Sequence, residues 1–355
     1  MQCGRVSPSV QSLPMKDTRR RFLKTLAVST VAPVLLDGAR TSAEPNPNGS
    51  SRHFHFVQMD VFASQRLQGN PLSVFTDARG LSDAEMQDLA RETNLQETTF
   101  VFPRETAIEA REGVKVRIFT PYEEVPFAGH PTLGTATILR TMRLDSGMVK
   151  ASEAAASTIV LDLKVGKIPV SFREEADGVF GEMRQVPPIF GPVLDRRAVA
   201  EALGLDAAEI DSGFPVQTVS TGLPFAIVPI RRLSTLQALQ FDFQKASACL
   251  KSQQAEASDF YFISRETGDP KVGLRARGLY STGEDAATGS AAGCTSAWMV
   301  KYGMAQPDET VLILQGVEMK RPSKIFVRSS KSGDSISNVR VGGHAVQIME
   351  GEVSL

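Results

Sequence analysis

Two glycine-containing stretches far apart in the chain carry polar side chains suited to holding a small acid. The first is VPFAGHPTLGTA, residues 125–136, and the second is GEDAATGSAAGCTSA, residues 283–297. In each, a predicted strand ends near a glycine, and small and apolar residues typical of a buried helix follow. The first N–H groups of a helix lack partners within the helix and lie at the positive end of its dipole. Both stretches are therefore predicted to bind a carboxylate or a phosphate.

The residues at these two turns offer backbone and side-chain hydrogen bonds to such an anion. Gly129 and Gly289 have no Cβ atom, so a ligand can approach their backbone closely. His130, Asp285 and Ser290 stand beside them, and we expect them to project into a cleft between two parts of the fold. Taken singly, His130 could be a loop residue that caps a helix, and Asp285 could be a turn or N-cap residue.

Metal and serine-hydrolase chemistry do not fit these patterns. The chain has four histidines and three cysteines without metal-ligand spacing, so we expect no metal and no cofactor. Ser290 stands in Gly-Ser-Ala-Ala-Gly, which differs from the Gly-x-Ser-x-Gly pattern of a serine nucleophile. Cys249 and Cys294 could form a disulfide only if the fold brings them together, which the sequence leaves open.

Glu97 is the candidate for proton transfer. It lies in NLQETTFVF, at the junction of a predicted helix and a predicted strand. A carboxyl group partly buried at the lip of a cleft has a raised pKa. Such a group suits a general acid/base that takes a proton from carbon and returns it elsewhere. Local sequence alone also allows a solvated glutamate at a helix end.

Four pairs of similar segments predict that the chain contains an internal duplication. They keep the same order in both halves. The pairs are GNPLSVF (69–75) with GLPFAIV (222–228), TFVFPRET (99–106) with YFISRET (261–267), VKVRIFTPY (114–122) with VGLRARGLY (272–280), and AGHPTLGTA (128–136) with TGSAAGCTS (288–296). We therefore expect two copies of one lobe, with the two glycine turns facing each other.

Hydrophobic patterns predict the elements that position these groups. Strands are expected where β-branched and aromatic residues gather, at 53–62, 98–103 and 114–121, and helices at 83–94, 133–142, 196–205 and 291–300. Ser82 and Glu85 have the spacing of a capping box at the first helix. The segment 339–351 is predicted to be a pair of strands interrupted by glycines. The fold class is thus α+β: two pseudo-symmetric lobes, each a curved sheet around a central helix.

The N-terminus is predicted to be an export signal rather than part of the fold. TRRRFLK (18–24) is followed by an apolar run and then by small residues, the order of a twin-arginine signal. We assign residues 1–43 to the signal and 44–52 to a linker, and expect a periplasmic or secreted protein, with a cytoplasmic one as the alternative. Acidic and basic residues nearly cancel, at 40 and 39, so charge does not favour nucleic acid or a membrane surface as a partner. No later run is long enough to span a bilayer, so we expect no membrane association after cleavage.

Together these stretches resemble the phenazine-biosynthesis PhzF-like family, which shares the diaminopimelate epimerase fold. The resemblance runs from Asp60 to Val353. It rests on DVFASQRLQGNPLSVF, NLQETTFVF, RIFTPYEEVPFAGHPTLGTA, TGLPFAIVPI, EDAATGSAA and VRVGGHAVQIMEGEV. It implies a homodimer and an N-terminal lobe of residues 53–165, joined by a C-terminal strand of residues 342–355. The C-terminal lobe would comprise residues 166–341.

The resemblance also implies roles for the candidate residues. Glu97 of ETTF matches the family's catalytic acid/base. His130, Asp285 and Ser290 match its substrate-binding and orienting residues, and the glycines beside them would supply backbone N–H groups. Two departures stand out: Ala286 replaces the usual proline after the aspartate, and Gln96 stands where serine is frequent. The cysteine pair of related epimerases is missing from both loops, which argues against thiol-based epimerisation.

These observations predict a cofactor-free isomerase that moves a proton on a small carboxylate substrate, of the dihydro-3-hydroxyanthranilate isomerase type. An exported protein that binds a small acid without changing it is the main alternative. An epimerase, lyase or hydrolase of the same fold would use the same residues. The sequence does not identify the substrate.

Overall fold

The computed structural model describes residues 51–355, except for residues 149–156, 241, 258 and 281–282. The predicted export signal, most of the predicted linker and Cys3 therefore lie outside the described residues. Among the described residues, no helix is long and apolar enough to cross a membrane.

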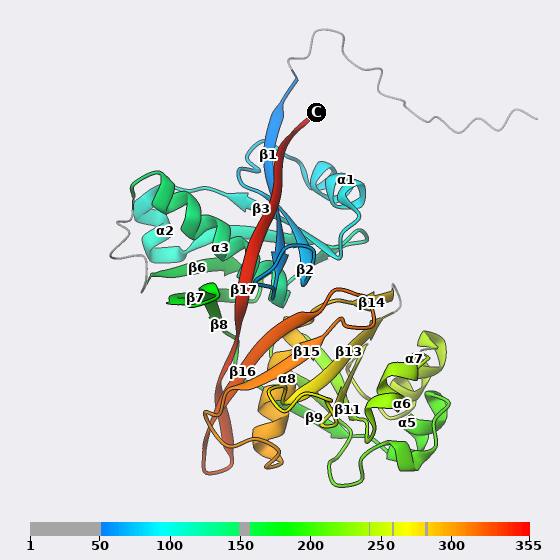
Figure 1. The fold of residues 1–355 in the computed structure, drawn as a ribbon. Coiled ribbons are helices and arrows are strands. Elements are labelled where there is room, and N and C mark those ends of the chain that lie inside the picture. Colours follow the sequence, from blue (N-terminus) through cyan, green and yellow to red (C-terminus); the bar gives the residue numbers. More distant parts are fainter. Residues whose placement is uncertain (1–50, 149–156, 241, 258, 281–282) are drawn as a thin grey trace, which may run out of the picture. The chain divides into compact units, whose positions relative to one another are not determined.

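The first half of the chain builds a mixed sheet with helices (Figure 1). Its elements are β1 (His53–Val61), β2 (Asn70–Phe75), α1 (Asp83–Thr93), β3 (Glu97–Phe102), α2 (Thr106–Glu112), β4 (Val114–Phe119), β5 (Glu124–Val125) and α3 (Gly129–Asp145). β2 pairs in parallel with β3, and β3, β4 and β5 pair antiparallel in turn. The predicted capping box at Ser82 and Glu85 is confirmed at the start of α1.

An antiparallel meander follows, and it stays in contact with the same central helix. It consists of β6 (Thr158–Leu163), β7 (Gly166–Glu175) and β8 (Gly178–Arg184). All three strands contact α3. The next strand, β9 (Ile189–Val193), instead pairs with β10 (Gln217–Ser220).

The second half repeats the order of the first: two strands, then three further strands, then a buried helix. Its elements are α5 (Arg196–Ala202), η1 (Ala207–Glu209), β11 (Pro224–Pro229), α6 (Leu233–Ala238), α7 (Phe243–Ser252), β12 (Asp259–Ser264), β13 (Leu274–Tyr280), β14 (Gly283–Asp285), α8 (Gly289–Lys301), β15 (Val311–Gln315) and β16 (Ser323–Ser332). β11 pairs in parallel with β12, and β12, β13 and β14 pair antiparallel. The predicted α+β class is confirmed as a mixed sheet with helices.

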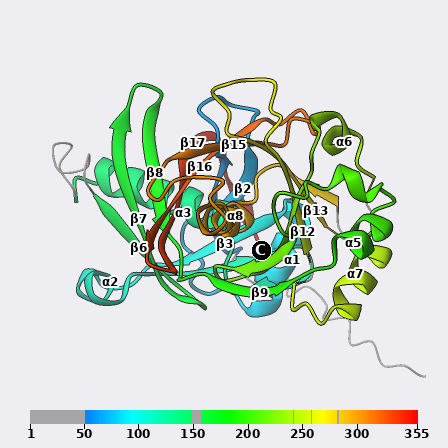
Figure 2. The same cartoon turned by 90° about the horizontal axis from the view of Figure 1, so that it is seen from below.

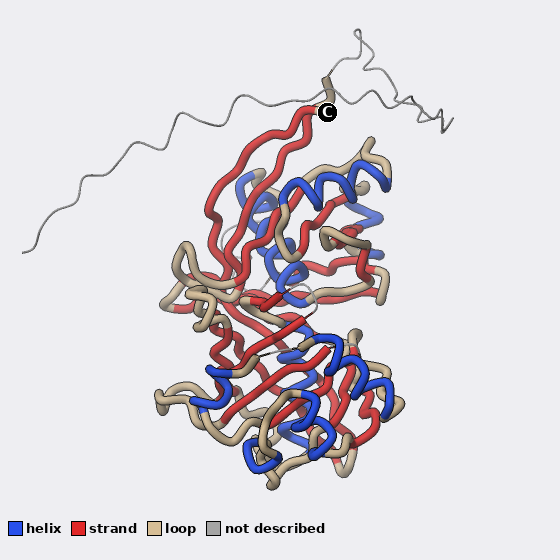
Figure 3. Tube along the Cα trace, turned by 90° about the vertical axis from the view of Figure 1, so that its right-hand side faces the viewer, coloured by secondary structure: helices blue, strands red, loops and turns tan. Residues whose placement is uncertain are grey.

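The C-terminal segment is one strand, so the predicted pair of strands interrupted by glycines is wrong. β17 (Ser335–Ser354) pairs first with β16 and β8 and then with β1. Figure 3 shows neighbouring strands that run together to the C-terminus. Gly342 and Gly343 make no turn here. A Cβ atom at these positions would lie within 2.8 Å of the rings of Phe180 and Phe62, respectively, so both glycines make room for an aromatic ring.

Two helices, α3 and α8, are the centres around which the strands pack. α3 contacts β1, β2, β3 and β17, whereas α8 contacts β10, β11, β16 and β17. Figure 2 shows α8 nearly end-on with strands around it. Every residue of α8 from Gly289 to Val300 is buried, because small and apolar residues occur on all its sides. Both helices begin at the predicted glycines, four residues before the apolar run in α3 and two residues before it in α8.

The starts of α3 and α8 meet backbone to backbone. A Cβ atom at Gly129 would lie 2.6 Å from the Cα atom of Gly289 and 2.7 Å from the backbone nitrogen of Ser290. A Cβ atom at Gly289 would lie 3.1 Å from the Cα atom of Gly129. The contact therefore requires glycine at position 129, because backbone atoms cannot move aside as the end of a side chain can.

The first prediction tests this contact. Gly129→Ala is expected to lower the free energy of unfolding by about 1–3 kcal/mol, because the added methyl group forces two helix starts apart. Gly213→Ala is the control, since its methyl group would meet only the side-chain oxygen of Asp211, at 3.2 Å. Urea denaturation of both variants measures the difference. Equal stability of Gly129→Ala and the wild type would contradict the close contact.

Candidate active site

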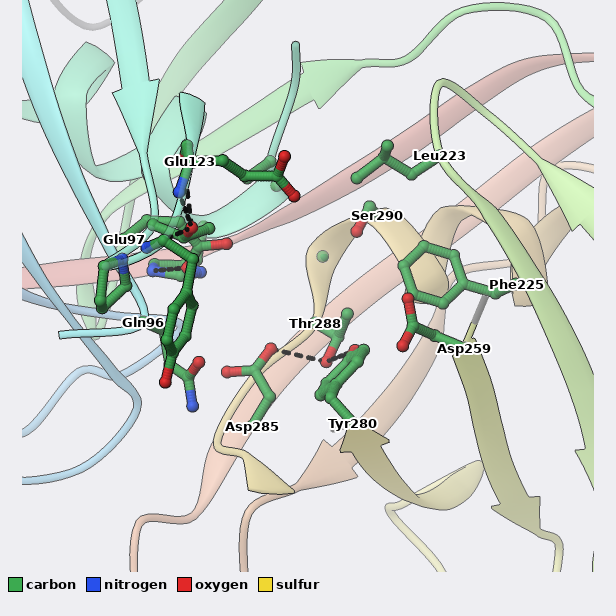
Figure 4. Close-up of a pocket in the computed structure, with 17 residues that line it drawn as sticks. Gln96, Glu97, Glu123, Leu223, Phe225, Asp259, Tyr280, Asp285, Thr288 and Ser290 are labelled. Carbon is green, nitrogen blue, oxygen red and sulfur yellow. Dashed lines mark hydrogen bonds and ion pairs between the residues drawn. The ribbon is translucent and has the colours of Figure 1, made fainter. Parts of the chain in front are cut away.

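The six residues singled out in the sequence line one cavity of about 630 Å³ at the meeting point of α3 and α8. They are Glu97, Gly129, His130, Asp285, Gly289 and Ser290. In Figure 4, Glu97 lies on one side, Asp285 and Thr288 lie below, and Ser290 lies on the α8 side. Asp259 and Phe225 form the wall opposite Glu97 (Figure 4). The structure thus brings all the predicted residues to one place.

Glu97 is the first residue of β3, and its side chain is 18% exposed. Its Oε2 atom lies 3.5 Å from the Nε2 atom of His130. Burial of the carboxyl group, and secondly the negative charge of Asp285, raise the pKa of Glu97 to about 8. The carboxyl group therefore titrates close to neutral pH, which is the range a proton-transfer group needs.

His130 lies in the first turn of α3 and is a neutral ring. Burial lowers its pKa to about 3, so the imidazolium form is absent near neutral pH. The Nδ2 atom of Asn70, which can only donate, lies 3.1 Å from the Nδ1 atom of His130. A ring hydrogen on Nε2, the nitrogen nearest to Glu97, leaves Nδ1 free to accept from Asn70. In that tautomer His130 is a neutral hydrogen-bond donor at the cavity wall.

Asp285 ends β14 and is held by donors on both carboxylate oxygens. The Nδ2 atom of Asn70 donates to Oδ1 at 2.6 Å, and the hydroxyl of Thr288 donates to Oδ2 at 2.8 Å. Burial raises the pKa of Asp285 to about 6, and these hydrogen bonds oppose the increase. Asp285 therefore gives up its proton at a lower pH than Glu97 does, and its charge then makes Glu97 harder to ionise.

A buried glutamine fixes Thr288, and with it Asp285. The Oε1 atom of Gln315 accepts from the hydroxyl of Tyr261 at 2.8 Å and from the backbone N–H of Thr288 at 3.0 Å. Its Nε2 atom donates to the backbone oxygen of Asp285 at 2.8 Å and to the Thr288 hydroxyl at 2.9 Å. Because all four contacts are buried, Gln315 holds the turn that presents Asp285.

Asn70 joins the two halves, and sequence reasoning gave it no role. Besides His130 and Asp285, its Nδ2 atom contacts the backbone oxygen of Ala287 at 3.0 Å. Asn70 is the asparagine of the GNP segment, which served only as evidence for the duplication. Sequence reasoning also missed Thr288 and Asp259, which line the cavity, and the buried Gln315, although Thr288 stands in the segment 283–297.

The two cysteines of the described chain are unpaired. Cys249 and Cys294 are both free and belong to different hydrophobic clusters. Cys294 is fully buried, as its place in the apolar helix predicts, and burial raises the pKa of its thiol to about 12. Within the described residues, no group of three or more histidine, cysteine or acidic side chains is arranged to hold a metal ion.

The fold and the sequence match proteins that are already known. Residues 59–351 match the family model for phenazine biosynthesis-like proteins. An uncharacterized isomerase from Mesorhizobium japonicum is 34% identical, with 84% of this chain and 98% of that protein covered. The trans-2,3-dihydro-3-hydroxyanthranilate isomerase of Pseudomonas aeruginosa is 33% identical, with 84% of this chain and 99% of that protein covered.

Solved structures agree with this assignment. A PhzF-family phenazine biosynthesis protein from Bacillus anthracis superimposes with a TM-score of 0.73 at 27% identity, covering 85% of this chain and 99% of that one. A predicted epimerase from Pseudomonas aeruginosa superimposes with a TM-score of 0.70 at 34% identity, covering 84% of this chain and 99% of that one. The chain belongs to the phenazine biosynthesis-like family, and it is an isomerase.

Proposed function

We propose that this isomerase works without a cofactor and that Glu97 moves a proton between carbon atoms of a small carboxylate substrate. The observation that carries the proposal is the raised pKa of Glu97, about 8, at the wall of a cavity beside two helix starts. As a carboxylate, Glu97 would take a proton from carbon. As the acid, it would return that proton to the carbon skeleton.

The surroundings of Glu97 support both halves of this cycle. The nearby charge of Asp285 favours the protonated form of Glu97, so the group accepts a proton readily. His130, neutral and with its hydrogen on Nε2, would donate to Glu97 or to an oxygen of the substrate. A neutral donor does not compete for the proton being moved, because its own pKa is only about 3.

The substrate's carboxylate is proposed to lie at the starts of α3 and α8. No lysine or arginine lines the cavity among the residues that the structure describes. The backbone N–H groups near Gly129 and Gly289, at the positive ends of two helix dipoles, are therefore the proposed anion site. The hydroxyl of Ser290, on the α8 side of the cavity, is proposed to complete it (Figure 4).

We further propose that the chain consists of the two pseudo-symmetric lobes predicted from the sequence, with the first lobe extending past the predicted boundary at residue 165. The repeated order of strands and the matching central helices support this. β7 and β8, which still contact α3, favour a boundary later than residue 165. Twin-arginine export to the periplasm and a homodimer are proposals that rest on the sequence and on the family resemblance.

The second prediction tests the role of Glu97 directly. Glu97→Gln is expected to lower the rate of deuterium incorporation from heavy water by at least about 100-fold, because the amide cannot carry the proton. NMR measures the incorporation, with trans-2,3-dihydro-3-hydroxyanthranilate as the first substrate, chosen because a relative is named for it. Other dihydroaromatic and β,γ-unsaturated acids follow.

The control for this experiment is Glu92→Gln, the same exchange at an exposed position of α1. It should incorporate deuterium as the wild type does. Equal incorporation by Glu97→Gln and the wild type would rule out the proposed role. A wild type that binds these acids without exchange or conversion would favour a small-acid binding protein instead.

The third prediction concerns stability and pH. The pKa of Glu97 is about 8 in the folded protein against an ordinary value of 4.5, so between these values the folded state binds more protons than the unfolded state. The contribution of Glu97 to the free energy of unfolding is therefore greatest at low pH and is lost as the pH rises through 8. Between pH 6.5 and pH 9, the free energy of unfolding of the wild type should fall by about 1–2 kcal/mol more than that of Glu97→Gln.

Urea denaturation of both proteins at the two pH values measures this gain. The chosen window lies above the pKa values of Asp285 and His130, about 6 and 3, so these groups change little within it. Glu92→Gln should show no such gain. If the free energies of unfolding of Glu97→Gln and the wild type differ by the same amount at both pH values, the pKa of Glu97 is not raised into this window.

A further inference from the structure

The carboxamide of Gln185 lies against the first turn of α8. Gln185 follows β8 in the connection to β9 and is 4% exposed. Its Nε2 atom donates to the backbone oxygen of Gly289 at 3.0 Å, and its Oε1 atom accepts from the hydroxyl of Thr221 at 2.6 Å. We propose that Gln185 is a positioning residue, which holds the peptide between Gly289 and Ser290 so that the N–H of Ser290 points to the carboxylate of the substrate. This inference rests on the proposed anion site at the two helix starts.

The two partners of the carboxamide decide which way round it lies. The backbone oxygen of Gly289 can only accept a hydrogen bond, so the NH2 group of Gln185 must face it. The hydroxyl of Thr221 then donates to the remaining oxygen. Both hydrogen bonds are buried, and a buried polar group that loses its partner costs free energy. The carboxamide is therefore held in one orientation.

The bond to Gly289 also sets the direction of an N–H group. In a trans peptide the C=O and N–H bonds point in opposite directions, and the part of the chain that the structure describes has no cis peptide bond. The oxygen of Gly289 and the N–H of Ser290 belong to one peptide, so this N–H points away from Gln185. Glycine leaves the backbone more freedom than any other residue. A side chain that anchors the oxygen of Gly289 thus restrains a peptide that is otherwise easily rotated.

The same peptide takes part in the contact between the two helix starts. A Cβ atom at Gly129 would lie 2.6 Å from the carbonyl carbon of Gly289 and 2.7 Å from the nitrogen of Ser290. All three residues line the cavity, and Figure 4 shows Ser290 on its α8 side. A rotation of this peptide would therefore change a donor of the proposed anion site at the place where α3 and α8 meet.

The first turn of α8 has room for the carboxamide only because Gly293 has no side chain. A Cβ atom there would lie 1.9 Å from the Oε1 atom and 2.6 Å from the Cδ atom of Gln185. The sequence match of 128–136 with 288–296 pairs Gly293 with Leu133 of α3. That leucine packs against β8, since a Cβ atom at Gly181 would lie 2.5 Å from its Cδ1 atom. Apolar packing suffices at this position of α3, whereas α8 has a directional polar contact.

A different role for Gln185 is to stabilise the fold without any effect on the cavity. Gln217 offers a matched comparison, because it is 5% exposed and makes the same kind of contacts. Its Nε2 atom donates to the backbone oxygen of Gly191 at 2.9 Å, and its Oε1 atom accepts from the hydroxyl of Tyr302 at 2.6 Å. Gln217 does not line the cavity. The two glutamines therefore separate a role in stability from a role in binding.

The fourth prediction compares Gln185→Met with Gln217→Met, with trans-2,3-dihydro-3-hydroxyanthranilate as the probe. Methionine has a similar length but cannot donate a hydrogen bond. Gln185→Met should raise KM at least about 10-fold and change kcat less than about threefold, because a contact with the carboxylate stabilises the bound substrate and the transition state alike. Gln217→Met should keep the KM and kcat of the wild type, although urea denaturation should show that both variants lose stability.

Thr221→Val is a second variant that keeps the test open if Gln185→Met does not fold. It preserves the size of the side chain and removes the hydroxyl that holds the Oε1 atom of Gln185. KM should rise about threefold, which corresponds to the loss of one hydrogen bond. The inference would be overturned by an unchanged KM in the folded variants, by an equal rise in Gln217→Met, or by a lower kcat with unchanged KM.

Crystal structures of the wild type and Gln185→Met without a substrate separate this inference from the proposed reaction. If the wild type does not convert the probe, the proposed function fails for that substrate, and these structures decide about Gln185. The peptide between Gly289 and Ser290 should be rotated in the variant, with its N–H turned away from the cavity. An unchanged peptide would contradict the role of Gln185. A wild-type N–H that already faces away from the cavity would overturn the proposed anion site, and this inference with it.

Discussion

The contact between the starts of α3 and α8 is the constraint on which the rest of the structure depends. Helix starts carry unsatisfied N–H groups and partial positive charge, so two of them repel each other unless something negative lies nearby. Here they approach so closely that Gly129 cannot carry a Cβ atom. The ionised carboxylate of Asp285, one turn before α8, and the proposed carboxylate of a substrate both relieve this repulsion. The partial positive charge at the two helix starts thus matters both for folding and for the proposed binding of a substrate.

Hydrogen bonds near the two helix starts explain why the pKa values of the two buried carboxyl groups differ. Asp285 receives hydrogen bonds from Asn70 and Thr288, which stabilise its charged form. Among the residues that the structure describes, the Glu97 carboxyl group has one side-chain contact with a nitrogen, the Nε2 atom of His130 at 3.5 Å. Two carboxylates in one buried cavity cannot both ionise easily, so the one with fewer donors keeps its proton to higher pH. The hydrogen-bond pattern therefore decides which group is the proton carrier.

Much of the fold and of the candidate site could be predicted from the sequence, because local patterns encode them. The capping box at Ser82, the glycines that open α3 and α8, and the six cavity residues all stand in short recognisable segments. Gln315 could not be found in this way. Its role arises from contacts with Tyr261 and Thr288 that only the folded chain creates. The glycines of β17 led to a wrong prediction of a strand break, because they make room for aromatic rings and form no turn.

The proposed duplication can be compared with the strand registers, which single motifs do not allow. Aligned on the shared Arg-Glu-Thr, the match of TFVFPRET with YFISRET pairs Glu97 with Ser258, one residue before Asp259. The strand registers instead pair Glu97 with Asp259, because each of these residues lies in the first pair of a parallel ladder. Only the folded chain thus shows which residues of the two halves take equivalent places in the wall of the cavity.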